Sequence, residues 1–277
     1  MTQTNIAPAL SGTTQYVRVD IRDGIATVSL DRPRVNALST GMMREIASVF
    51  WQLGQGSEAA VAILTSARDG MFSAGADIND SERRYAKREL AEGESLRDLI
   101  DPGKVARDCF TGIRSGGLPV IAALNGAALG AGAVLVACCD LIVAAEEAWL
   151  SLPEINVGVA GGYRHMQRLF GPFKARELAY RGNRVAASEL YRLGAAAEVV
   201  PLQQVQGAAR SLAVEIAAKS PLALRIAKES MDRAEDMGLD EGYALEQHYT
   251  ARTSLLADSR EARDSFREKR APQWNWS

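Results

Sequence analysis

The sequence predicts an α/β fold, in which buried strands alternate with helices, followed by a helical region of separate character. Three short, continuously apolar segments are typical of strands buried on both faces: 59–65 (AAVAILT), 119–124 (PVIAAL) and 140–145 (DLIVAA). Helical patterns separate these strands, as expected for a layered α/β fold. After residue 200 the pattern changes to four consecutive helical segments, at 205–219, 221–237, 239–256 and 259–270.

The first elements of the chain are a hairpin and a helix. Residues 16–20 and 25–30 alternate polar and apolar side chains around the Asp-Gly pair at 23–24, which predicts a β-hairpin. Ser39 or Thr40 can cap a helix that runs to about Leu53, because a hydroxyl oxygen accepts a bond from a free N–H of the first turn. The first buried strand follows this helix.

The middle of the chain alternates turn-rich and helical segments. Residues 69–77 are predicted to form turns, and residues 81–115 are charged and mostly helical with a break at 101–103 (DPG). A glycine-rich segment then leads into an apolar helix at 131–138. The predicted organisation is a loose tail at 1–14, a core at 15–202 and a helical C-terminal region at 203–277.

Composition excludes several classes of protein. The 277 residues are 47% hydrophobic, and 32 basic against 34 acidic residues give a net charge of −2, without the basic excess of a nucleic-acid binder. No apolar stretch approaches the roughly 20 residues of a membrane span, and the start lacks a signal-peptide pattern. Cys109, Cys138 and Cys139 are too few for a disulfide framework and fit a reducing cytoplasm. With only His165 and His248, no histidine-based metal site is expected.

Two segments of small residues are candidate binding sites. Residues 72–77 (FSAGAD) follow a buried strand, and small side chains there let a ligand approach main-chain N–H groups. Residues 125–132 (NGAALGAG) follow the next strand and begin a helix, whose N-terminus offers unpaired N–H donors. A dinucleotide-binding fingerprint is the rival interpretation of the second segment, but Leu135 stands where its third glycine or alanine belongs. The ordinary interpretation of residues 72–77 is a strand-to-helix turn.

Glu154 is the candidate acid or base. It lies among Trp149, Leu150, Leu152 and Ile155, and an apolar environment raises the pKa of a carboxyl group toward neutrality. The segment 157–162 (VGVAGG) that follows is again rich in glycine. Alone, Glu154 would be interpreted as a surface glutamate in a loop. The three sites together support a functional interpretation of each.

Taken together, these segments resemble the crotonase (enoyl-CoA hydratase/isomerase) superfamily. The matching motifs cover roughly residues 16–270 in family order and spacing. They are 30–33 (LDRP), 36–38 (NAL), 72–77 (FSAGAD), 119–132 (PVIAALNGAALGAG), 139–140 (CD), 153–154 (PE), Gly158, 167–169 (QRL) and 265–270 (SFREKR).

The resemblance implies a crotonase-like spiral of ββα turns with a helical C-terminal oligomerisation region, assembled as a homotrimer or a dimer of trimers. The implied substrate is an acyl-CoA thioester, so that coenzyme A arrives with the substrate and no separate cofactor, nucleic acid or membrane is involved. The N–H groups of Ala76 and Ala131 would form the oxyanion hole, although the family usually has glycine at the second position. Removing one such donor typically costs about 3–4 kcal/mol of barrier.

Further residues take roles only through the resemblance. Ala74 would face the adenine of coenzyme A, and Asp77 and Ile78 belong to the same substrate-binding segment. Phe266 and Lys269 would help to hold coenzyme A from the same or an adjacent subunit.

Departures from the family pattern concern the acid/base pair. Hydratases of this family use two glutamates; here the first position is Val134, which cannot transfer a proton, and the second is Glu154. Gly162 matches a family glycine whose N–H positions water or substrate. The bulky Tyr163, Arg164 and His165 then replace a small glycine-rich stretch and are expected to enter or fill the acyl pocket.

A single carboxylate favours isomerase-type transfer of one proton between two carbons, as in a Δ3,Δ2-enoyl-CoA isomerase. Hydration by Glu154, alone or assisted by Tyr163 or His165, stays open. So do decarboxylation, thioester hydrolysis and non-catalytic acyl-CoA binding. The acyl group depends on pocket shape, which the segment 80–115 partly sets.

Overall fold

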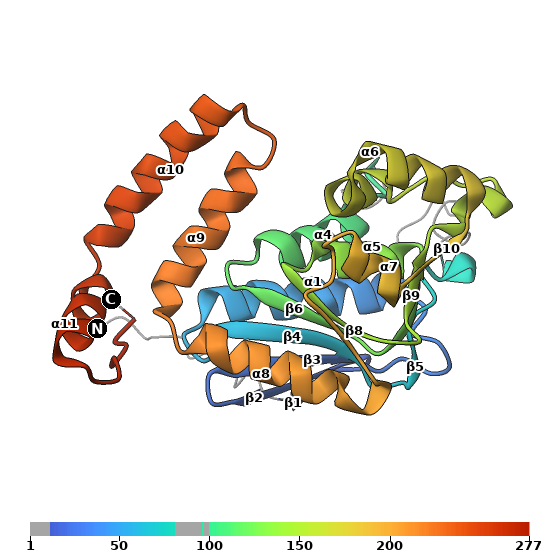
Figure 1. Ribbon diagram of the computed structural model, residues 1–277. Coiled ribbons are helices and arrows are strands. Elements are labelled where there is room, and N and C mark those ends of the chain that lie inside the picture. The colour runs from blue at the N-terminus through green and yellow to red at the C-terminus, as the bar shows by residue number, and fades with distance from the viewer. Residues whose placement is uncertain (1–11, 81–95, 97–99, 277) are drawn as a thin grey trace.

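The computed structural model describes residues 12–80, 96 and 100–276 (Figure 1). Residues 1–11 of the predicted tail, and residues 81–95 and 97–99 of the predicted helical segment 81–115, lie outside the described residues. The described residues form two β-sheets, and the larger one has seven strands in the order β1-β2-β3-β4-β6-β8-β11. Their bounds are Gly12–Thr13 (β1), Val17–Arg22 (β2), Ile25–Leu30 (β3), Val61–Ser66 (β4), Val120–Leu124 (β6), Leu141–Ala145 (β8) and Glu198–Val200 (β11).

The smaller sheet carries the strands that lead to the candidate site. It has four strands in the order β10-β9-β7-β5, and β5, β7 and β9 are parallel neighbours. Their bounds are Gly70–Ser73 (β5), Gly126–Leu129 (β7), Trp149–Ser151 (β9) and Arg184–Ala186 (β10). Each of β5, β7 and β9 directly follows a strand of the larger sheet, so the chain passes repeatedly from one sheet to the other. This arrangement confirms the predicted spiral of strand–strand–helix turns.

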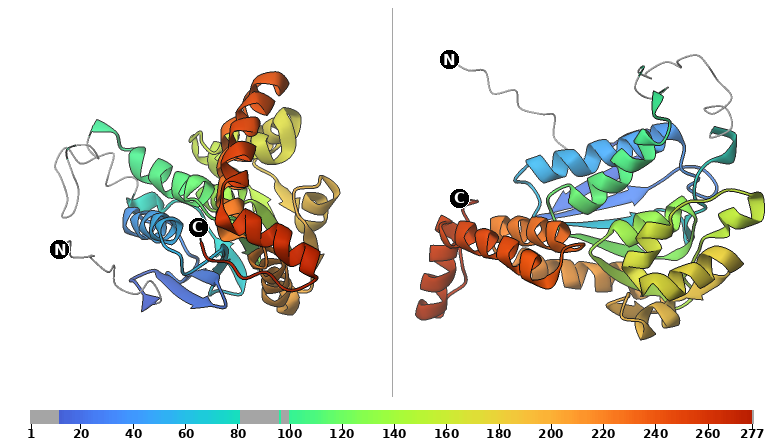
Figure 2. Two further views of the ribbon diagram at one scale, coloured as in Figure 1. Left: turned by 90° about the vertical axis from the view of Figure 1, so that its left-hand side faces the viewer. Right: turned by 90° about the horizontal axis from the view of Figure 1, so that it is seen from above.

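Helices cover both faces of the larger sheet (Figures 1 and 2). α8 contacts β4, β6 and β8 on one face, and the paired helices α1 and α4 cover the other. α5 is apolar all round and buried along nearly its whole length, as expected for a helix inside a core. The bounds are Thr40–Gln55 (α1), Lys104–Ser115 (α4), Ala131–Cys138 (α5), Pro153–Val157 (η1), Tyr163–Arg181 (α6), Ala187–Arg192 (α7), Leu202–Gln204 (η2) and Val205–Ala217 (α8).

Several local predictions are confirmed. The hairpin β2–β3 turns at Asp23 and Gly24, both with positive φ, which is the turn that an Asp-Gly pair favours. Ser39 caps α1, its hydroxyl accepting a bond from Met42 N at 3.3 Å. The three buried apolar segments form β4, β6 and β8, which pair in parallel. Continuous apolar sequence identified these strands because both of their faces are covered.

Two predictions were incomplete. The segment predicted as turns at 69–77 contains β5, and the segment at 125–132 contains β7 before its helix. The two strands pair where their backbones approach very closely: a Cβ at Gly126 would lie 2.1 Å from the carbonyl carbon of Gly70. Small residues permit this approach, and they also remove the β-branched pattern from which strands are predicted.

Five elements were not predicted, because each lacks a clear periodic pattern: α6, β9, β10, α7 and β11. α6 is interrupted by Gly171, with φ 74° and ψ 172°, and by Pro172. The other four elements have between three and six residues. Elements this short depend on their sheet partners rather than on local sequence.

Three helices form an arm that projects from the core (Figures 1 and 2). They are Pro221–Ala234 (α9), Leu239–Ser254 (α10) and Ala257–Glu268 (α11). α9 and α10 pack on each other as an antiparallel pair. α8, which begins the predicted C-terminal region at 203–277, instead packs against the larger sheet. The projecting arm therefore starts at α9.

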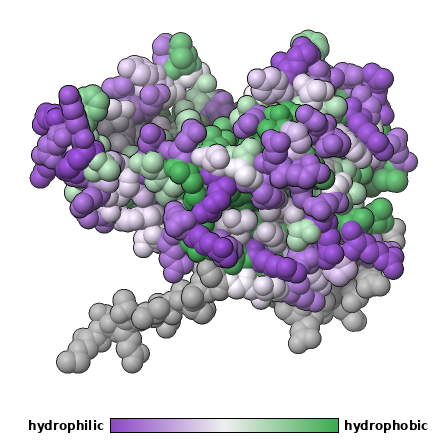
Figure 3. Space-filling model, turned by 60° about the horizontal axis from the view of Figure 1, so that its bottom comes forward, coloured by the Kyte–Doolittle hydropathy of each residue, from purple (hydrophilic) through white to green (hydrophobic). Residues whose placement is uncertain are grey.

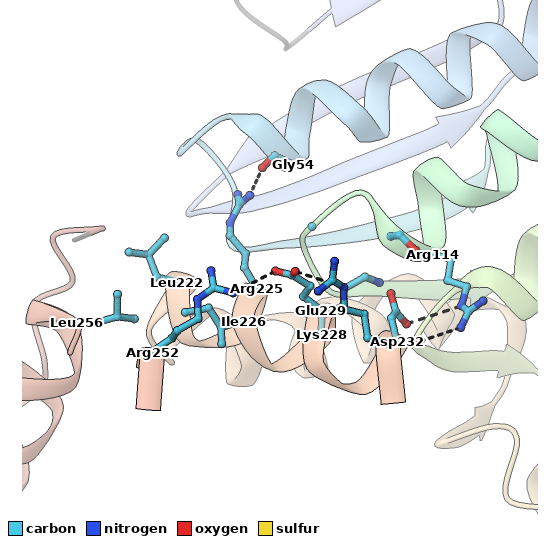
Figure 4. A pocket seen from close by; sticks show the side chains of 13 residues that line it. Gly54, Arg114, Leu222, Arg225, Ile226, Lys228, Glu229, Asp232, Arg252 and Leu256 are labelled. Atoms are coloured by element: carbon cyan, nitrogen blue, oxygen red, sulfur yellow. Dashed lines mark hydrogen bonds and ion pairs between the residues drawn. The ribbon is translucent and has the colours of Figure 1, made fainter. Parts of the chain in front are cut away.

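Two cations of α9 attach the arm to the core (Figure 4). The Arg225 guanidinium donates to the carbonyl of Gly54 in the last turn of α1 and to those of Gly56 and Ala59 just after it, where the helix dipole favours a positive charge. Lys228 is 3% exposed, and its Nζ lies 2.6 Å from Asp140 Oδ2. A cavity of about 620 Å³, lined mainly by charged side chains, lies between these contacts and α10.

Polar side chains cover most of the face seen in Figure 3, and apolar ones form small, scattered patches there. Among the described residues, no helix is both long and apolar enough to span a bilayer. The same residues contain no cluster of three or more histidine, cysteine, aspartate or glutamate side chains placed to hold a metal ion.

Candidate active site

The first amide of the candidate site belongs to Ala76, directly after β5. Leu38 N donates to Gly75 O at 2.7 Å, and Asp77 N donates to Leu38 O at 3.1 Å, forming a parallel bridge between Leu38 and Ala76. Gly75 C=O and Ala76 N–H share one trans peptide, so they point in opposite directions. The Ala76 N–H is therefore directed away from Leu38, and it has no backbone acceptor within the described residues.

The second amide belongs to Ala131, the first residue of α5. A first-turn N–H has no acceptor within its own helix, so the Ala131 N–H is free to bind a ligand. The two segments touch: a Cβ at Gly75 would lie 2.6 Å from Leu129 O and 3.4 Å from Ala131 N. Only glycine fits position 75, which also has a φ of 88°.

Glu154 is brought beside this second amide by β-sheet pairing. β9 runs parallel to β7, and Gly130 N donates to Ser151 O at 2.8 Å. The chain then enters the first turn of η1, which carries Glu154. A Cβ at Gly130 would lie 2.3 Å from Glu154 Oε1, so the carboxylate occupies the space that a side chain at Gly130 would take. Gly130 directly precedes Ala131.

The environment of Glu154 suits proton transfer. Burial raises the pKa of its carboxyl group, and a hydrogen bond from its own backbone N–H opposes this only in part. The buried Oε2 has no hydrogen-bond partner among the described residues. A carboxyl group with a raised pKa and an unpaired oxygen is suited to accept a proton and to return it.

An apolar wall lies on the far side of the α5 turn. Val134 is buried one turn after Ala131, and its N–H donates to Gly130 O at 3.0 Å. A Cβ at Gly162, whose φ is 75°, would lie 2.9 Å from Val134 Cγ2 and 3.1 Å from Leu152 Cδ2. Val134 and Gly162 are therefore in contact, and the position of the first of the two family glutamates faces hydrocarbon.

The bulky residues that follow Gly162 diverge in direction. Tyr163 is partly buried against the core. The His165 ring packs edge-on against Phe110 of α4, with ring centroids 5.5 Å apart. Burial and the neighbouring Arg114 lower the pKa of His165. Arg164 instead forms an ion pair with Asp236, just beyond α9. His165 thus joins α6 to α4, and Tyr163 alone of the three packs on the core beside Gly162.

The remaining predicted residues of this segment are held to the start of the chain. Ala74 N donates to Val35 O at 2.9 Å, and Asp77 forms an ion pair with Arg32 at 2.7 Å. Burial tends to raise the pKa of Asp77, but bonds from Asp80 N and Arg32 outweigh it and keep the pKa below its usual value. Ile78 is 63% exposed.

Phe266 and Lys269 lie far from Glu154 within one chain. Both belong to the end of α11, at the opposite side of the molecule from β9 and α6 (Figures 1 and 2). Phe266 is 85% exposed, and Lys269 ends the helix in a left-handed conformation. The structure therefore does not bring these two residues to Glu154 within one chain.

Sequence reasoning missed the residues that make the approach of these segments possible. Gly75 and Gly130 leave room for Leu129 O and for the Glu154 carboxylate, and Ser73 lies buried between the two amide-bearing segments. Glycines inside both motifs were a signal of close backbone contact. The partner of each contact lies far away in the sequence and could not be read from it.

Comparison with known proteins identifies the family of the chain. The family model for enoyl-CoA hydratase/isomerase matches residues 20–276. The chain is 34% identical to the (7aS)-7a-methyl-1,5-dioxo-2,3,5,6,7,7a-hexahydro-1H-indene-carboxyl-CoA hydrolase of Rhodococcus jostii, over 91% of this chain and 93% of that protein. It is 31% identical to the carnitinyl-CoA dehydratase of Proteus mirabilis, over 94% and 98% of the two chains.

A solved structure shows the same fold. The enoyl-CoA hydratase of Bacillus anthracis superimposes with a TM-score of 0.84 at 31% identity, covering 95% of this chain and all of that one. The family match spans nearly the whole chain, and these relatives are aligned over more than nine-tenths of their length. The predicted crotonase-like fold is confirmed, and the chain belongs to the enoyl-CoA hydratase/isomerase family.

Proposed function

We propose that this protein is an acyl-CoA-processing enzyme in which two backbone amides hold the thioester oxygen and Glu154 transfers a proton. One observation carries the proposal: the Glu154 carboxylate lies against Gly130, beside the free Ala131 N–H, while the Ala76 segment touches the same helix start. Negative charge that develops on a thioester oxygen is stabilised by fixed N–H donors. A carboxylate next to these donors is placed to act on the carbon α to the thioester.

The reaction that we favour is isomerase-type proton transfer. Glu154, as carboxylate, removes a proton from the α carbon of a 3-enoyl-CoA, and the electron pair delocalises to the thioester oxygen as a dienolate. The Ala76 and Ala131 amides hold that oxygen. Glu154 then returns the proton at the γ carbon, which gives the 2-enoyl-CoA. Buried Val134 offers no second proton donor, and this step needs none.

Hydration or dehydration is the second candidate reaction. A relative at 31% identity carries the name carnitinyl-CoA dehydratase, so addition or loss of water occurs in closely similar chains. Here Glu154 would have to act both on water and on the α carbon. Gly162, which touches Val134, would supply an N–H toward water or substrate.

The proposed substrate carries its own coenzyme A, and no further cofactor enters the scheme. We also propose that the chain works as a homotrimer or a dimer of trimers. The projecting arm exposes large apolar side chains, including Leu239 at 89%, and the predicted coenzyme A contacts Phe266 and Lys269 lie too far from Glu154 within one chain. A neighbouring subunit that covers the arm would bring them to a site.

A panel of acyl-CoA thioesters, followed by mass spectrometry, tests the proposal. Glu154→Gln should lower kcat on a 3-enoyl-CoA by about 10²–10⁴-fold, the range for losing a positioned acid or base. The matched control is Glu147→Gln, which changes an exposed glutamate on the turn before β9. Full activity in Glu154→Gln would eliminate this carboxylate as the base. Tight thioester binding by wild type without turnover of any member would favour a non-catalytic binding protein.

A further inference from the structure

Ser73 lies where the two amide-bearing segments meet. It is the last residue of β5, is fully buried, and pairs with Ala128 of β7. We propose that the Ser73 hydroxyl is a positioning group that sets the Ala76 amide relative to the Ala131 amide. This inference rests on the proposed function, because it assumes that the two amides share one oxygen.

On one side, the Ser73 hydroxyl holds the loop that carries Ala76. Its Oγ donates to Asn36 O at 2.7 Å and accepts from Gly75 N at 3.2 Å. The next peptide is held by the bond from Leu38 N to Gly75 O. Gly75 is therefore anchored at both its N–H and its C=O. Because glycine is otherwise the freest residue, these two bonds determine the direction of the Ala76 N–H.

On the other side, Ser73 packs against the first turn of α5. A Cβ at Gly132 would lie 2.7 Å from Ser73 Cβ and from Ser73 O, and 2.9 Å from Ser73 Oγ. Gly132 directly follows Ala131. One buried side chain thus touches both segments, so a change in its position alters the distance between the amides.

The acceptor of the Ser73 hydroxyl is itself held rigidly. Asn36 is fully buried in a left-handed conformation with φ 49°. Its Nδ2 donates to Ser66 Oγ at 2.8 Å and to Phe72 O at 3.1 Å, and its Oδ1 accepts from Arg32 N at 2.8 Å. The carbonyl that receives the Ser73 hydroxyl therefore has little freedom. Loss of the hydroxyl would release Gly75 N–H rather than move Asn36.

Loss of the Ser73 hydroxyl should affect only the binding of the thioester oxygen. Fixed donors stabilise charge only when they are aimed at the atom where the charge develops, and a small displacement is costly. Ser73 is fully buried and its hydroxyl bonds to Asn36 O and Gly75 N, so we expect it to touch neither the acyl chain nor coenzyme A. Removing the hydroxyl should therefore weaken the binding of the oxygen and leave the rest of the ligand unaffected.

Two ligands that differ at the carbonyl separate these effects. Butanoyl-CoA presents a thioester oxygen, and S-butyl-CoA, a thioether, lacks it. Calorimetric titration should show that wild type prefers the thioester and that Ser73→Ala lowers this preference about tenfold, with unchanged affinity for the thioether. In the wild-type complex, the infrared stretch of a ¹³C-labelled thioester carbonyl should lie at lower frequency than in water. In the Ser73→Ala complex, this frequency should shift back toward its value in water.

Thr65→Val is the matched control. The Thr65 hydroxyl is also buried and has two partners, donating to Ala123 O at 3.1 Å and accepting from Gln206 Nε2 at 2.6 Å. This variant should lose similar stability and keep the full thioester preference and carbonyl shift. Ser73→Cys, whose thiol is somewhat larger and a weaker hydrogen-bond donor and acceptor, should give an intermediate preference and serves as the second variant if Ser73→Ala does not fold.

The outcomes distinguish the inference from the proposed function. If wild type shows no preference and no carbonyl shift, the two-amide site is wrong and the inference falls with it. If wild type shows both, and Ser73→Ala or Ser73→Cys retains both in full, the site stands and the positioning role of Ser73 is overturned. An equal loss in Thr65→Val would assign the effect to general destabilisation and also overturn the inference.

Discussion

The candidate site and the projecting arm are built by opposite means. The site is an assembly of backbone: three segments approach so closely that glycine is required at Gly75 and Gly130. Glu154, whose pKa is raised, adds an ionisable side chain to this assembly. The arm is attached through charged side chains, Arg225 and Lys228, which reach carbonyls and a carboxylate of the core. Backbone contact is rigid because it leaves few degrees of freedom, whereas long charged side chains join surfaces that do not fit closely.

This difference predicts opposite sensitivities. The site should fail when atoms are added, because no space is left for them. The arm should fail when a charge is removed, because its buried partner then lacks compensation. Four substitutions test this contrast, from the largest expected effect to the smallest.

Adding one methyl group at Gly130 should have the largest effect. Gly130 has φ 52° and ψ −123°, and the new Cβ would lie 2.3 Å from Glu154 Oε1. Gly130→Ala should therefore push the carboxylate away from the Ala131 amide and lower kcat about 100-fold, with strain of about 1–3 kcal/mol. Gly194→Ala, at φ 74° in open space, is the control for strain alone. Equal activity losses in the two variants would contradict the close-contact account of the site.

Removing the buried cation of the arm should cost stability instead. Lys228→Met leaves Asp140 Oδ2 with its bond from Val120 N at 2.7 Å but without its counter-charge. We expect the free energy of unfolding to fall by about 2–3 kcal/mol in urea titrations. Adding Asp140→Asn to this variant should recover part of the loss, since no uncompensated charge then remains. A stability equal to wild type would show that the ion pair does not hold α9 on the core.

Exchanging Arg225 for lysine should have a smaller effect of the same kind. A planar guanidinium contacts several carbonyls at once, including Gly56 O and Ala59 O, and an ammonium group cannot. Arg225→Lys should lower the free energy of unfolding by about 1 kcal/mol in the same urea titration. Arg210→Lys, whose partner Asp23 is 82% exposed, should change almost nothing. Similar losses in both variants would argue against a capping role for Arg225.

The smallest expected effect is a gain in stability at the site. Burial raises the folded-state pKa of Glu154 above its ordinary value of 4.5, so the folded protein binds this proton more tightly than the unfolded chain. The contribution of Glu154 to stability is therefore present below pH 4.5 and lost as pH rises through the folded pKa. At neutral pH, Glu154→Gln should raise the free energy of unfolding by about 0.5 kcal/mol after allowing for solvent screening, and the variant should unfold at a slightly higher temperature. Thermal melts should show that the difference in stability between the variant and wild type shrinks toward pH 4.5. A variant less stable than wild type at neutral pH would contradict the raised pKa.

Prediction from sequence succeeded where local pattern and final structure coincide. The Asp23–Gly24 turn, the Ser39 cap and the buried strands each depend on residues close together in the chain. Prediction failed for β5 and β7, whose small residues serve close pairing, and for α6, which Gly171 and Pro172 interrupt. The roles of Ala76, Ala131 and Glu154 stay predictions, now supported by their placement at one helix start.

By itself, the sequence determined the α/β class, the family resemblance and the segments that form the candidate site, because motifs and buried apolar strands are local properties. Only the tertiary structure decided which atoms meet. It placed the Glu154 carboxylate against Gly130, Ser73 between two loops and His165 against Phe110 rather than beside Gly162. Such contacts join residues tens of positions apart, and they are set by the register of β5, β7 and β9, which no single segment of the chain encodes.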